Sequence, residues 1–381
     1  MLSPSRITGA GLLVALMAVL GSPTALADTG SDVQCGDTLT ASVQLDADLN
    51  CTGTALTIAA SGVTVDLGGH TVTGTTSGIS AHDQTGVTIS NGTVGGGISL
   101  TRVSSSAFST LHVDSLSLSS VDSAVVTDSV IQNGRISLQG VLSLVRSSVI
   151  GVSGIATASA VIMTDSTVTD SSFTSESTGF TLTGSTLTRS RISGTESGAQ
   201  VATKNKFIQS RMSFFFANRL DIEDNQFTGA DSGLGLTDLT FKASVIKGNV
   251  FNGGGVGVSI DARDLRGLND IAISHNVFVD NSAAGILLQA RGTGSTHAIT
   301  ISDNVFSSNG KASNGSVDLD GVPVDDGLHI DVPPASPVTV SDNFTLNNAD
   351  HGIEAQPGTV IDGGGNISVG DPAGCLGVIC K

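Results

Sequence analysis

Short runs of alternating apolar and polar residues recur along the chain, and one phrase returns five times between Val201 and Phe306. Each copy has an Asn two residues before a Phe and an apolar or small residue three places before the Asn. The copies centre on Asn205, Asn225, Asn249, Asn276 and Asn304, with the rings at Phe207, Phe227, Phe251, Phe278 and Phe306. A unit that recurs every few tens of residues indicates a solenoid, in which each unit buries its apolar face against its neighbours.

A weaker form of the repeat extends upstream, with Ser in place of Asn and an aliphatic residue in place of Phe. The predicted anchors are Ser129, Ser148, Ser166 and Ser185, followed two residues later by Ile131, Ile150, Val168 and Leu187. A second apolar column is expected seven places after each anchor, at Ile136, Ile155, Phe173, Ile192, Met212 and Val256. No helical period fits these columns and the local alternation has a period of two, so the units are short strands.

Stacking such units places each strand beside its copy one coil later, in the parallel direction, with a rise of about 4.8 Å per coil. The Asn and Ser columns then form hydrogen-bonded ladders at the corners. The sequence therefore predicts an all-β protein, a single right-handed parallel β-helix of roughly 12 to 15 coils. We assign residues 54–370 to this β-helix, residues 28–53 to an N-terminal cap and residues 371–381 to a C-terminal cap.

Composition and charge narrow the classes of function. The 381 residues include 48 Gly and only 13% charged residues, which suits strands and turns. A formal net charge of −17 keeps the molecule soluble and argues against nucleic acid as a partner. We expect a monomer. Trp and Tyr are both absent, so a conventional carbohydrate-binding module with flat aromatic platforms is not expected.

The N-terminus and the cysteines point to an exported protein. Residues 1–27 have a positive start, an apolar run and a small-residue cleavage site, as in a secretory signal peptide. The alternative is a membrane anchor, but the apolar run is too short to span about 30 Å of hydrocarbon.

Four cysteines allow three pairings. Since the ends of a solenoid lie far apart, we expect the local pairs Cys35–Cys51 and Cys375–Cys380, which close the open ends of the β-helix. A metal site made of these thiols is the alternative.

The segment from Val65 to Val72 reads Val-Asp-Leu-Gly-Gly-His-Thr-Val and follows a Cys-Gly-Asp segment at Cys35. With these residues the chain resembles the secreted bacterial parallel β-helix repeat proteins of the pectin-lyase-like superfamily. The resemblance covers the whole mature chain and implies the fold. That superfamily holds lyases, hydrolases, epimerases and proteins without an assigned role, so it implies no single activity. His70 is either a catalytic group or a histidine lining a turn of the first coil.

Arginines form the first candidate site. Arg135, Arg191 and Arg211 each lie six places after an anchor and next to an inward residue, so they point outward. Arg191 and Arg211 fall on adjacent coils, and alternation leaves Phe215 outside. Two guanidinium groups one strand spacing apart on an acidic protein suggest a bound anion such as a uronate or a sulfate. The alternative is a pair of solvated surface arginines.

Acidic residues and histidines form the second candidate site, in the widest coil. Asp325, Asp326 and His329 are candidates for acid and base catalysis, while Asp318, Asp320 and Asp331 are candidates for binding Ca²⁺; no cofactor is required. His351 follows one coil later, in an order similar to that of polygalacturonase-type hydrolases, but the Arg-Ile-Lys motif of those enzymes is missing. The alternative is an acidic solvated loop.

These observations predict a secreted protein, extracellular or at the cell surface, that contacts polysaccharide, and they leave open whether it is an enzyme. A polysaccharide lyase or a glycoside hydrolase is one alternative, and a non-catalytic structural or adhesive rod is another. No span of the membrane is expected after cleavage of the signal peptide.

Overall fold

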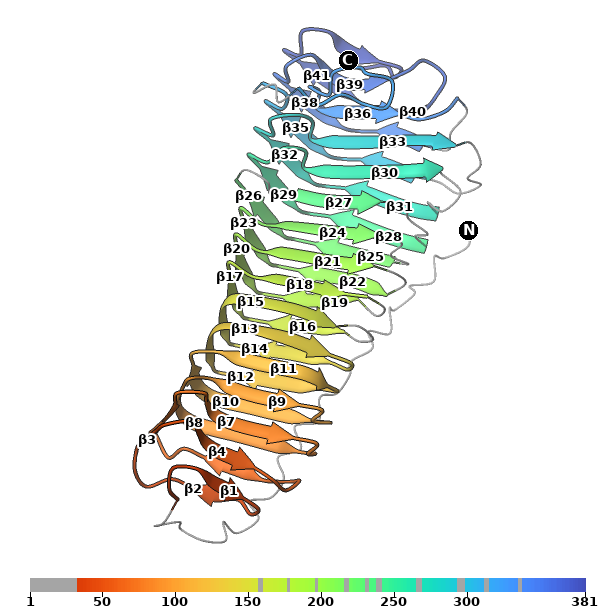
Figure 1. Cartoon of the computed structure of the whole chain (residues 1–381). Helices are drawn as coiled ribbons and strands as arrows, with labels where there is room; N and C mark the ends of the chain where they lie inside the picture. Colours follow the sequence, from red (N-terminus) through yellow and green to blue (C-terminus); the bar gives the residue numbers. More distant parts are fainter. Residues whose placement is uncertain are drawn as a thin grey trace, which may run out of the picture.

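The computed structural model describes residues 33–156, 160–176, 179–195, 198–215, 219–229, 233–237, 242–264, 269–292, 299–311, 315–334 and 338–381. The expected signal peptide, residues 1–27, and the first residues of the expected cap lie outside this part of the chain. The described residues form one parallel β-helix of about 15 turns and contain no α-helix (Figure 1). Accordingly, they include no helix long and apolar enough to cross a membrane.

Parallel pairing arranges the strands in three rows along the rod, here called the first, second and third sheets. The first sheet contains β1 Asp37–Leu39, β4 Thr54–Ile58, β7 Ser77–His82, β9 Ile98–Thr101, β11 Leu116–Val121, β13 Val130–Leu138, β15 Ser148–Ala156, β18 Ser172–Ser175, β21 Arg191–Thr195, β24 Arg211–Phe215, β27 Gly233–Thr237, β30 Val258–Asp264, β33 Ile286–Gly292, β36 Leu328–Asp331, β39 His351–Ala355 and β42 Gly374–Leu376. The second contains β2 Val43–Gln44, β5 Thr64–Asp66, β8 Val87–Gly95, β10 Ser106–Val113, β12 Ala124–Thr127, β14 Leu142–Val145, β16 Val161–Thr164, β19 Phe180–Thr183, β22 Ala199–Thr203, β25 Arg219–Glu223, β28 Lys242–Lys247, β31 Asn269–Ser274, β34 Ile299–Ser302, β37 Val338–Ser341 and β40 Ile361–Gly364. The third contains β3 Leu49–Cys51, β6 Thr71–Gly74, β17 Thr167–Thr169, β20 Thr186–Thr188, β23 Lys206–Ile208, β26 Gln226–Thr228, β29 Val250–Asn252, β32 Val277–Val279, β35 Val305–Ser307, β38 Phe344–Leu346 and β41 Ile367–Val369, together with parts of β8, β10, β13 and β15. Long strands such as β10, β13 and β15 take part in two of these rows and connect them.

The predicted Phe column forms the spine of the C-terminal half of the core. The five rings from Phe207 to Phe306 are buried and stack on successive coils, with ring centroids 4.4 to 5.0 Å apart and nearly parallel planes. The residues three places before each Asn, from Ala202 to Ile301, are also fully buried. Because the ring spacing equals the rise between parallel strands, one inward position per coil builds a continuous apolar column.

The predicted Asn ladder is present at the corner that precedes this column. Each buried side chain accepts a hydrogen bond from the backbone N–H of the previous anchor, as Asn249 Oδ1 does from Asn225 at 2.9 Å. Asn249 Nδ2 then donates to Asn276 Oδ1 at 3.0 Å. The residue before each Asn adopts a left-handed conformation, for example Asp224 with φ 55° and His275 with φ 57°. Asp, Gly and His tolerate this conformation better than most residues, which explains why they recur there.

The upstream part of the predicted register is wrong by one residue in a single coil. Ser147, not Ser148, accepts the ladder hydrogen bond from the backbone of Ser129 and donates its own N–H to Ser166 Oγ. Val149 is therefore buried and Ile150 is exposed. In a strand a shift of one residue moves every side chain to the other face.

The second predicted column is wrong by the same one residue in this coil and by two residues in a later coil. Gly154 and not Ile155 lies opposite Ile136 and Phe173, and farther along Val258 rather than Val256 lies opposite Leu234. The other members of that column, Ile136, Phe173, Ile192 and Met212, are buried as predicted.

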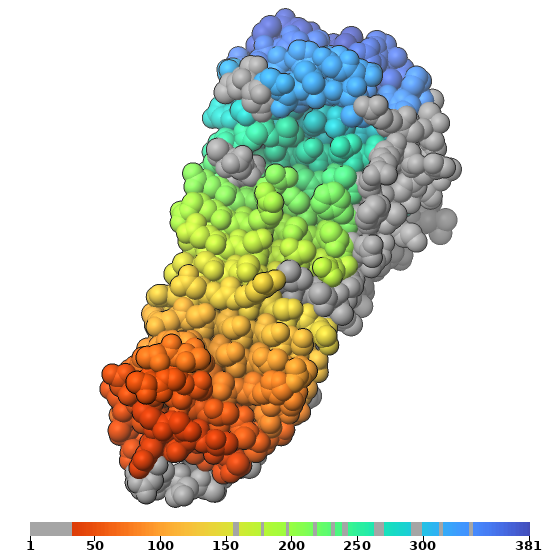
Figure 2. Space-filling view, in the orientation of Figure 1, coloured from red at the N-terminus to blue at the C-terminus, as the bar shows by residue number. Residues whose placement is uncertain are grey.

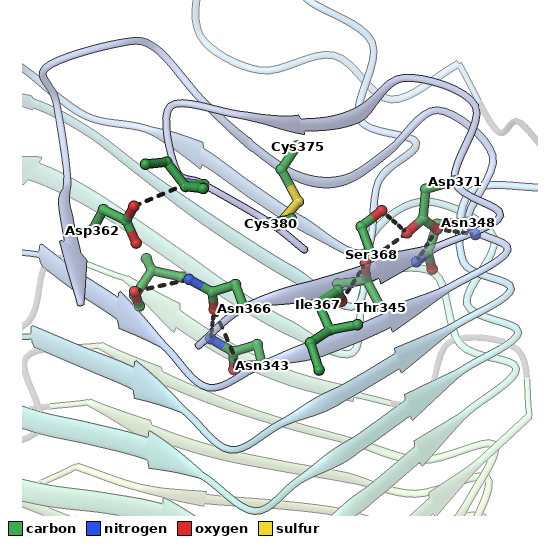
Figure 3. Close-up of a disulfide and its surroundings, with 12 residues drawn as sticks. Asn343, Thr345, Asn348, Asp362, Asn366, Ile367, Ser368, Asp371, Cys375 and Cys380 are labelled. Atoms are coloured by element: carbon green, nitrogen blue, oxygen red, sulfur yellow. Dashed lines mark hydrogen bonds between the residues drawn. A yellow bond between two sulfur atoms is a disulfide. The ribbon is translucent and has the colours of Figure 1, made fainter. Parts of the chain in front are cut away.

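Disulfide bonds close both ends of the rod, as predicted. Cys35 pairs with Cys51 and Cys375 with Cys380. At the C-terminal end the first Asn ladder ends on Asn366 (Figure 3). A second ladder, formed by Asn281, Asn309 and Asn348, ends on the buried carboxylate of Asp371. In the space-filling view the last coils, in blue, form one blunt end of an elongated molecule (Figure 2).

Candidate metal centre

The chain places a group of acidic residues and histidines where three consecutive strands of the first sheet begin. Gly285, Gly327 and Gly352 stack at this point, with Gly285 N–H donating to Gly327 O and Gly327 N–H donating to His351 O. Because Asp326 and His351 each precede one of these glycines, they occupy equivalent positions on adjacent coils. The sequence has the same Asn-x-x-x-Gly-Ile pattern at 281–286 and 348–353, and both copies lead into strands of the first sheet. The second copy places His351 beside Asp326.

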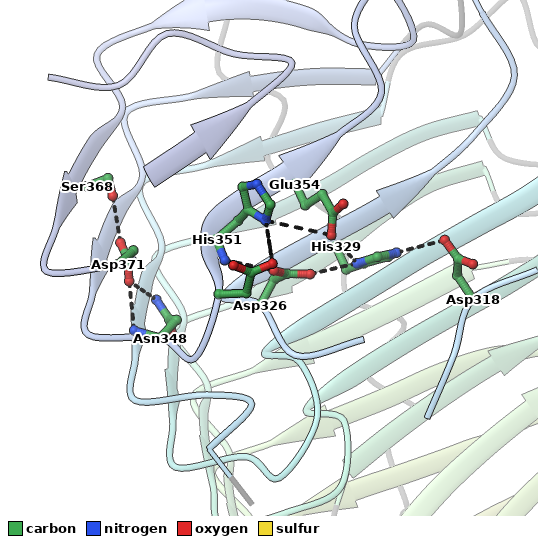
Figure 4. A network of polar contacts seen from close by, with 9 residues as sticks. Asp318, Asp326, His329, Asn348, His351, Glu354, Ser368 and Asp371 are labelled. Carbon is green, nitrogen blue, oxygen red and sulfur yellow. Dashed lines mark hydrogen bonds and ion pairs between the residues drawn. The ribbon is translucent and has the colours of Figure 1, made fainter. Parts of the chain in front are cut away.

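His329 lies at the centre of this group and is 2% exposed (Figure 4). Its Nδ1 is 2.7 Å from Asp326 Oδ2 and 3.1 Å from Glu354 Oε2, and its Nε2 is 3.1 Å from Asp318 Oδ2. Asp326 is completely buried, and its other oxygen, Oδ1, accepts the backbone N–H of His351 at 2.9 Å. Both imidazole nitrogens of His329 are therefore committed to carboxylates.

His351 differs from His329 because its ring lacks a satisfied partner. Its Nδ1 lies 3.5 Å from Asp326 Oδ1, 3.1 Å from Asp350 Oδ2 and 3.9 Å from Glu354 Oε2. This nitrogen is buried, yet none of these neighbours gives it a well-formed hydrogen bond. A buried polar atom without a hydrogen bond is costly, so the position calls for a further ligand or proton.

Burial and neighbouring charges shift the pKa values of the group. Burial lowers the pKa of His329, but hydrogen bonds to Asp326 and Asp318 and the charges of Asp326 and Glu354 together raise it to about 9. Burial, followed by the hydrogen bond and the charge of Asp326, raises the pKa of Glu354 to about 7. Burial and the charge of Asp326 also raise the pKa of Asp325. His329 therefore carries a positive charge near neutral pH and offsets part of the surrounding negative charge.

Two sets of donor atoms in this group lie close enough to share one ion. Asp326, His351 and Glu354 each offer a ligand atom within 4.8 Å of the others, as do Asp325, Asp326 and Asp350. The first set combines an imidazole nitrogen with two carboxylates, and the second contains oxygen only. Imidazole with carboxylate suits Cu²⁺ or Zn²⁺, whereas an all-oxygen set suits Ca²⁺ or Mg²⁺.

Sulfur ligands are lacking in the described part of the chain. All four cysteines form disulfides, and Met163 and Met212 are fully buried in the core, away from this surface. Cu⁺ prefers thiolate and thioether ligands. The residues present thus fit a cupric ion and do not fit a cuprous one.

The structure brings together some of the predicted site residues and separates others. Asp326, His329, His351 and Asp318 meet in one cluster, and Asp325 borders it. Asp320 and Asp331 line a neighbouring cleft of about 430 Å³. Burial and the charges of Asp318 and Asp320 raise the pKa of Asp331, and the shared metal site of these three carboxylates stays a prediction.

Two further residues differ in how the sequence analysis treated them: Glu354 was not predicted, and His70 was left with two interpretations. Glu354 was missed, although it lies opposite His329 in the register, two places after the corresponding Gly. His70 Nδ1 lies 3.2 Å from Asp48 Oδ1 in the first coils, as a turn-lining histidine would.

The predicted arginine row is present on the outward face of the first sheet. Arg191 and Arg211 are direct partners on β21 and β24, and Arg135 lies in the same row three coils earlier. Phe214 is buried and Phe215 is 41% exposed, as alternation predicts. Phe216, which alternation predicts to be buried like Phe214, lies outside the described residues.

The fold defines a parallel β-helix repeat protein of the right-handed, pectin-lyase-like type. The chain belongs to the family described as periplasmic copper-binding protein (NosD), whose model matches residues 121–318. The matched residues include the arginine row and end before Asp326. Neither a search of curated proteins nor a search of solved structures found a match.

Proposed function

We propose that this protein is an exported, monomeric β-helix that binds a divalent transition-metal ion, Cu²⁺, through Asp326, His351 and Glu354. The observation that carries the proposal is the buried Nδ1 of His351. This nitrogen lies among the carboxylates of Asp350, Asp326 and Glu354, yet it has no hydrogen bond among the described residues. Its ligand atom lies within 4.8 Å of those of Asp326 and Glu354. The description of the family as periplasmic and copper-binding supports the same choice of metal and compartment.

The remaining residues of the cluster have supporting roles in this proposal. The hydrogen bond between His329 Nδ1 and Asp326 Oδ2 fixes the carboxylate of Asp326, and its other oxygen, Oδ1, faces His351. Asp318 in turn holds the far side of the His329 ring. Hydrogen bonds of this kind fix the orientation of metal ligands and commonly change affinity about 10- to 100-fold. Bound here, the ion would supply a strong positive charge and, as Cu²⁺, a redox-active centre.

Burial favours metal binding over catalysis on a polymer. A hydrolase or lyase that used Asp325, Asp326 and His329 would have to bring these groups to a glycosidic bond. Asp326 is completely buried and His329 is 2% exposed, so a polysaccharide cannot contact them. A single ion needs only the rim of the cluster, where the side chains of His351 and Glu354 are 16% and 11% exposed.

Titration of metal-free protein with Cu²⁺, followed by calorimetry and electron paramagnetic resonance, tests the proposal. We expect one tight site with nitrogen coupling, lost in the His351→Gln variant and weakened about 10- to 100-fold in His329→Gln. The matched control is His275→Gln, because His275 is an exposed histidine on a corner of another coil. The proposal is wrong if His351→Gln binds Cu²⁺ as tightly as the parent, or if His275→Gln loses the same site.

A second candidate function, contact with polysaccharide, is favoured by a different part of the surface. Arg191, Arg211 and Phe215 line one shallow cleft of about 340 Å³ on the outward face of the first sheet. An exposed aromatic ring beside charged and hydroxyl groups is a suitable surface for a sugar chain. This function does not require catalysis and is compatible with metal binding near the C-terminal end. Binding of the purified protein to polysaccharides, with and without Ca²⁺, tests it.

A further inference from the structure

We infer that the outward face of the first sheet between β15 and β30 is a binding groove for an acidic polysaccharide, with Arg191 and Arg211 as its anion-binding residues. The inference deepens the second candidate function proposed above and is independent of the metal centre. It rests on the spacing of the two arginines, on their lack of acidic partners, and on the clefts that meet at them.

The two arginines are held side by side by the backbone. Arg191 on β21 and Arg211 on β24 are direct register partners, so their Cα atoms are about 4.8 Å apart, the spacing of adjacent strands. Both side chains point outward because Ile192 and Met212, which follow them, are buried. Two guanidinium groups at this spacing repel each other unless an anion lies between or across them.

The nearby charges do not neutralise this pair. Asp170, the carboxylate in the same cleft, is taken by Arg189, whose Nε and a terminal nitrogen donate to it at 2.6 and 2.7 Å. Arg211 Nε donates to the hydroxyl of Ser213 at 3.2 Å. Neither Arg191 nor Arg211 forms an ion pair with a carboxylate among the described residues. An uncompensated cationic pair on a chain with a net charge of −17 is unusual and points to an anionic ligand.

Three clefts meet at Arg211 and extend along the axis of the rod. The largest, of about 820 Å³, runs from Gly151 on β15 past Arg191 to Arg211. The second, of about 340 Å³, continues from these arginines to Phe215, and the third, of about 180 Å³, reaches Ser259 on β30. The clefts together cross six consecutive coils, which corresponds to a length of about 24 Å at the strand spacing.

The residues that line the groove fit a sugar chain. Between the arginine row and Phe215 runs a row of small residues, which pair in register: Ser193, Ser213, Gly235 and Ser259. Hydroxyl groups donate and accept hydrogen bonds with sugar hydroxyls, and small side chains allow a chain to approach the sheet. Phe215 supplies an exposed apolar ring at one edge.

Carboxylate or sulfate groups on the polymer are the partners that two guanidinium groups recognise best, because each can bind an arginine through two parallel hydrogen bonds. A double-stranded nucleic acid carries one charge per about 1.7 Å, and an acidic protein repels so dense a charge. An acidic polysaccharide has more widely spaced charges and hydroxyl groups between them. These differences favour the polysaccharide.

The test compares binding of the full-length protein to polygalacturonate, dextran sulfate and uncharged dextran by calorimetry. We expect binding to one or both acidic polymers and none to dextran. The double variant Arg191→Gln/Arg211→Gln should weaken that binding by about tenfold or more, with a smaller dependence on salt. Phe215→Ala should weaken it without changing the salt dependence.

A matched control keeps the result independent of net charge. Arg102→Gln/Arg146→Gln removes the same charge from exposed positions outside the groove, and it should bind like the parent. If the parent binds dextran as well as the acidic polymers and the groove variant is unaffected, polysaccharide contact stands but this inference fails. If the parent binds none of the three polymers, or if both double variants lose binding equally, the groove does not have this function.

Discussion

Replacement of Phe278 by Ala is the most direct perturbation of the core, because this ring lies in the middle of the Phe column. Phe278 is fully buried, and its ring centroid is 5.0 Å from those of both Phe251 and Phe306, with planes within 4° and 7° of parallel. Loss of a buried Phe side chain costs about 3–5 kcal/mol through lost burial and the cavity left behind.

The cost should lie near the upper end of that range. The spacing of Phe251 and Phe306 is fixed by the hydrogen bonds between β29, β32 and β35, so the two rings cannot close over the gap. Two stacked aromatic contacts are lost as well, each worth about 0.5–1.5 kcal/mol beyond burial. We therefore expect roughly 4–5 kcal/mol of destabilisation.

Urea unfolding followed by far-ultraviolet circular dichroism measures this change, since the chain has neither Trp nor Tyr for fluorescence. Phe215→Ala is the matched control, because Phe215 is 41% exposed and should change stability by about 0.5 kcal/mol at most. A loss below about 1 kcal/mol for Phe278→Ala, or equal losses for the two variants, would refute the assignment of the column.

Three further predictions concern the ladder, the glycines and the acidic cluster. Asn276→Ala should lower the free energy of unfolding by about 1–3 kcal/mol, because the buried backbone N–H of Asn249 loses its acceptor. Asn276→Ser should lower it less, since Ser occupies this corner in the upstream coils. Equal losses of the two variants in urea unfolding would contradict the ladder. Gly285→Ala should lower the free energy of unfolding by about 1–3 kcal/mol, because the added Cβ would lie 2.7 Å from the ring of Phe306. In the control Gly255→Ala the added Cβ meets nothing within 4 Å. Equal stability of the two variants would argue against this packing. The folded-state pKa values of Glu354 and His329, about 7 and about 9, lie above their usual values of 4.5 and 6.5. The folded metal-free protein therefore holds protons that the unfolded chain releases, at Glu354 between about pH 4.5 and 7 and at His329 between about pH 6.5 and 9. Its stability should fall as the pH rises across these two ranges. A constant or rising stability there would be the contrary result.

The sequence predicts the fold well because the repeat is redundant. Five copies of the Asn and Phe columns agree with one another, so an error in one copy has little weight. The weakest point was the coil with two adjacent serines, Ser147 and Ser148, either of which can serve as the anchor. Only the hydrogen bonds to Ser129 and Ser166 distinguish them, and these are contacts between coils that no local pattern contains.

The candidate site was predicted less completely, and for a physical reason. Asp326 and His329 are neighbours in sequence and were found together. Glu354 lies beside them because β39 pairs with β36 in parallel, with Glu354 opposite His329. The coils here differ in length, so this register could not be derived from the spacing of the repeat. Asp318 was predicted as a metal ligand with Asp320 and Asp331, and its carboxylate also contacts His329 Nε2 across the wide loop, which no local pattern in the sequence indicates.

Anomalous X-ray diffraction at the copper absorption edge, from crystals grown with Cu²⁺, would locate the bound ion directly. We expect one strong anomalous peak within bonding distance of His351 Nδ1, with Asp326 and Glu354 as the other protein ligands of the ion. A peak elsewhere on the rod, for example at Asp320 and Asp331, or no peak at this cluster in protein that binds Cu²⁺ tightly in solution, would contradict it.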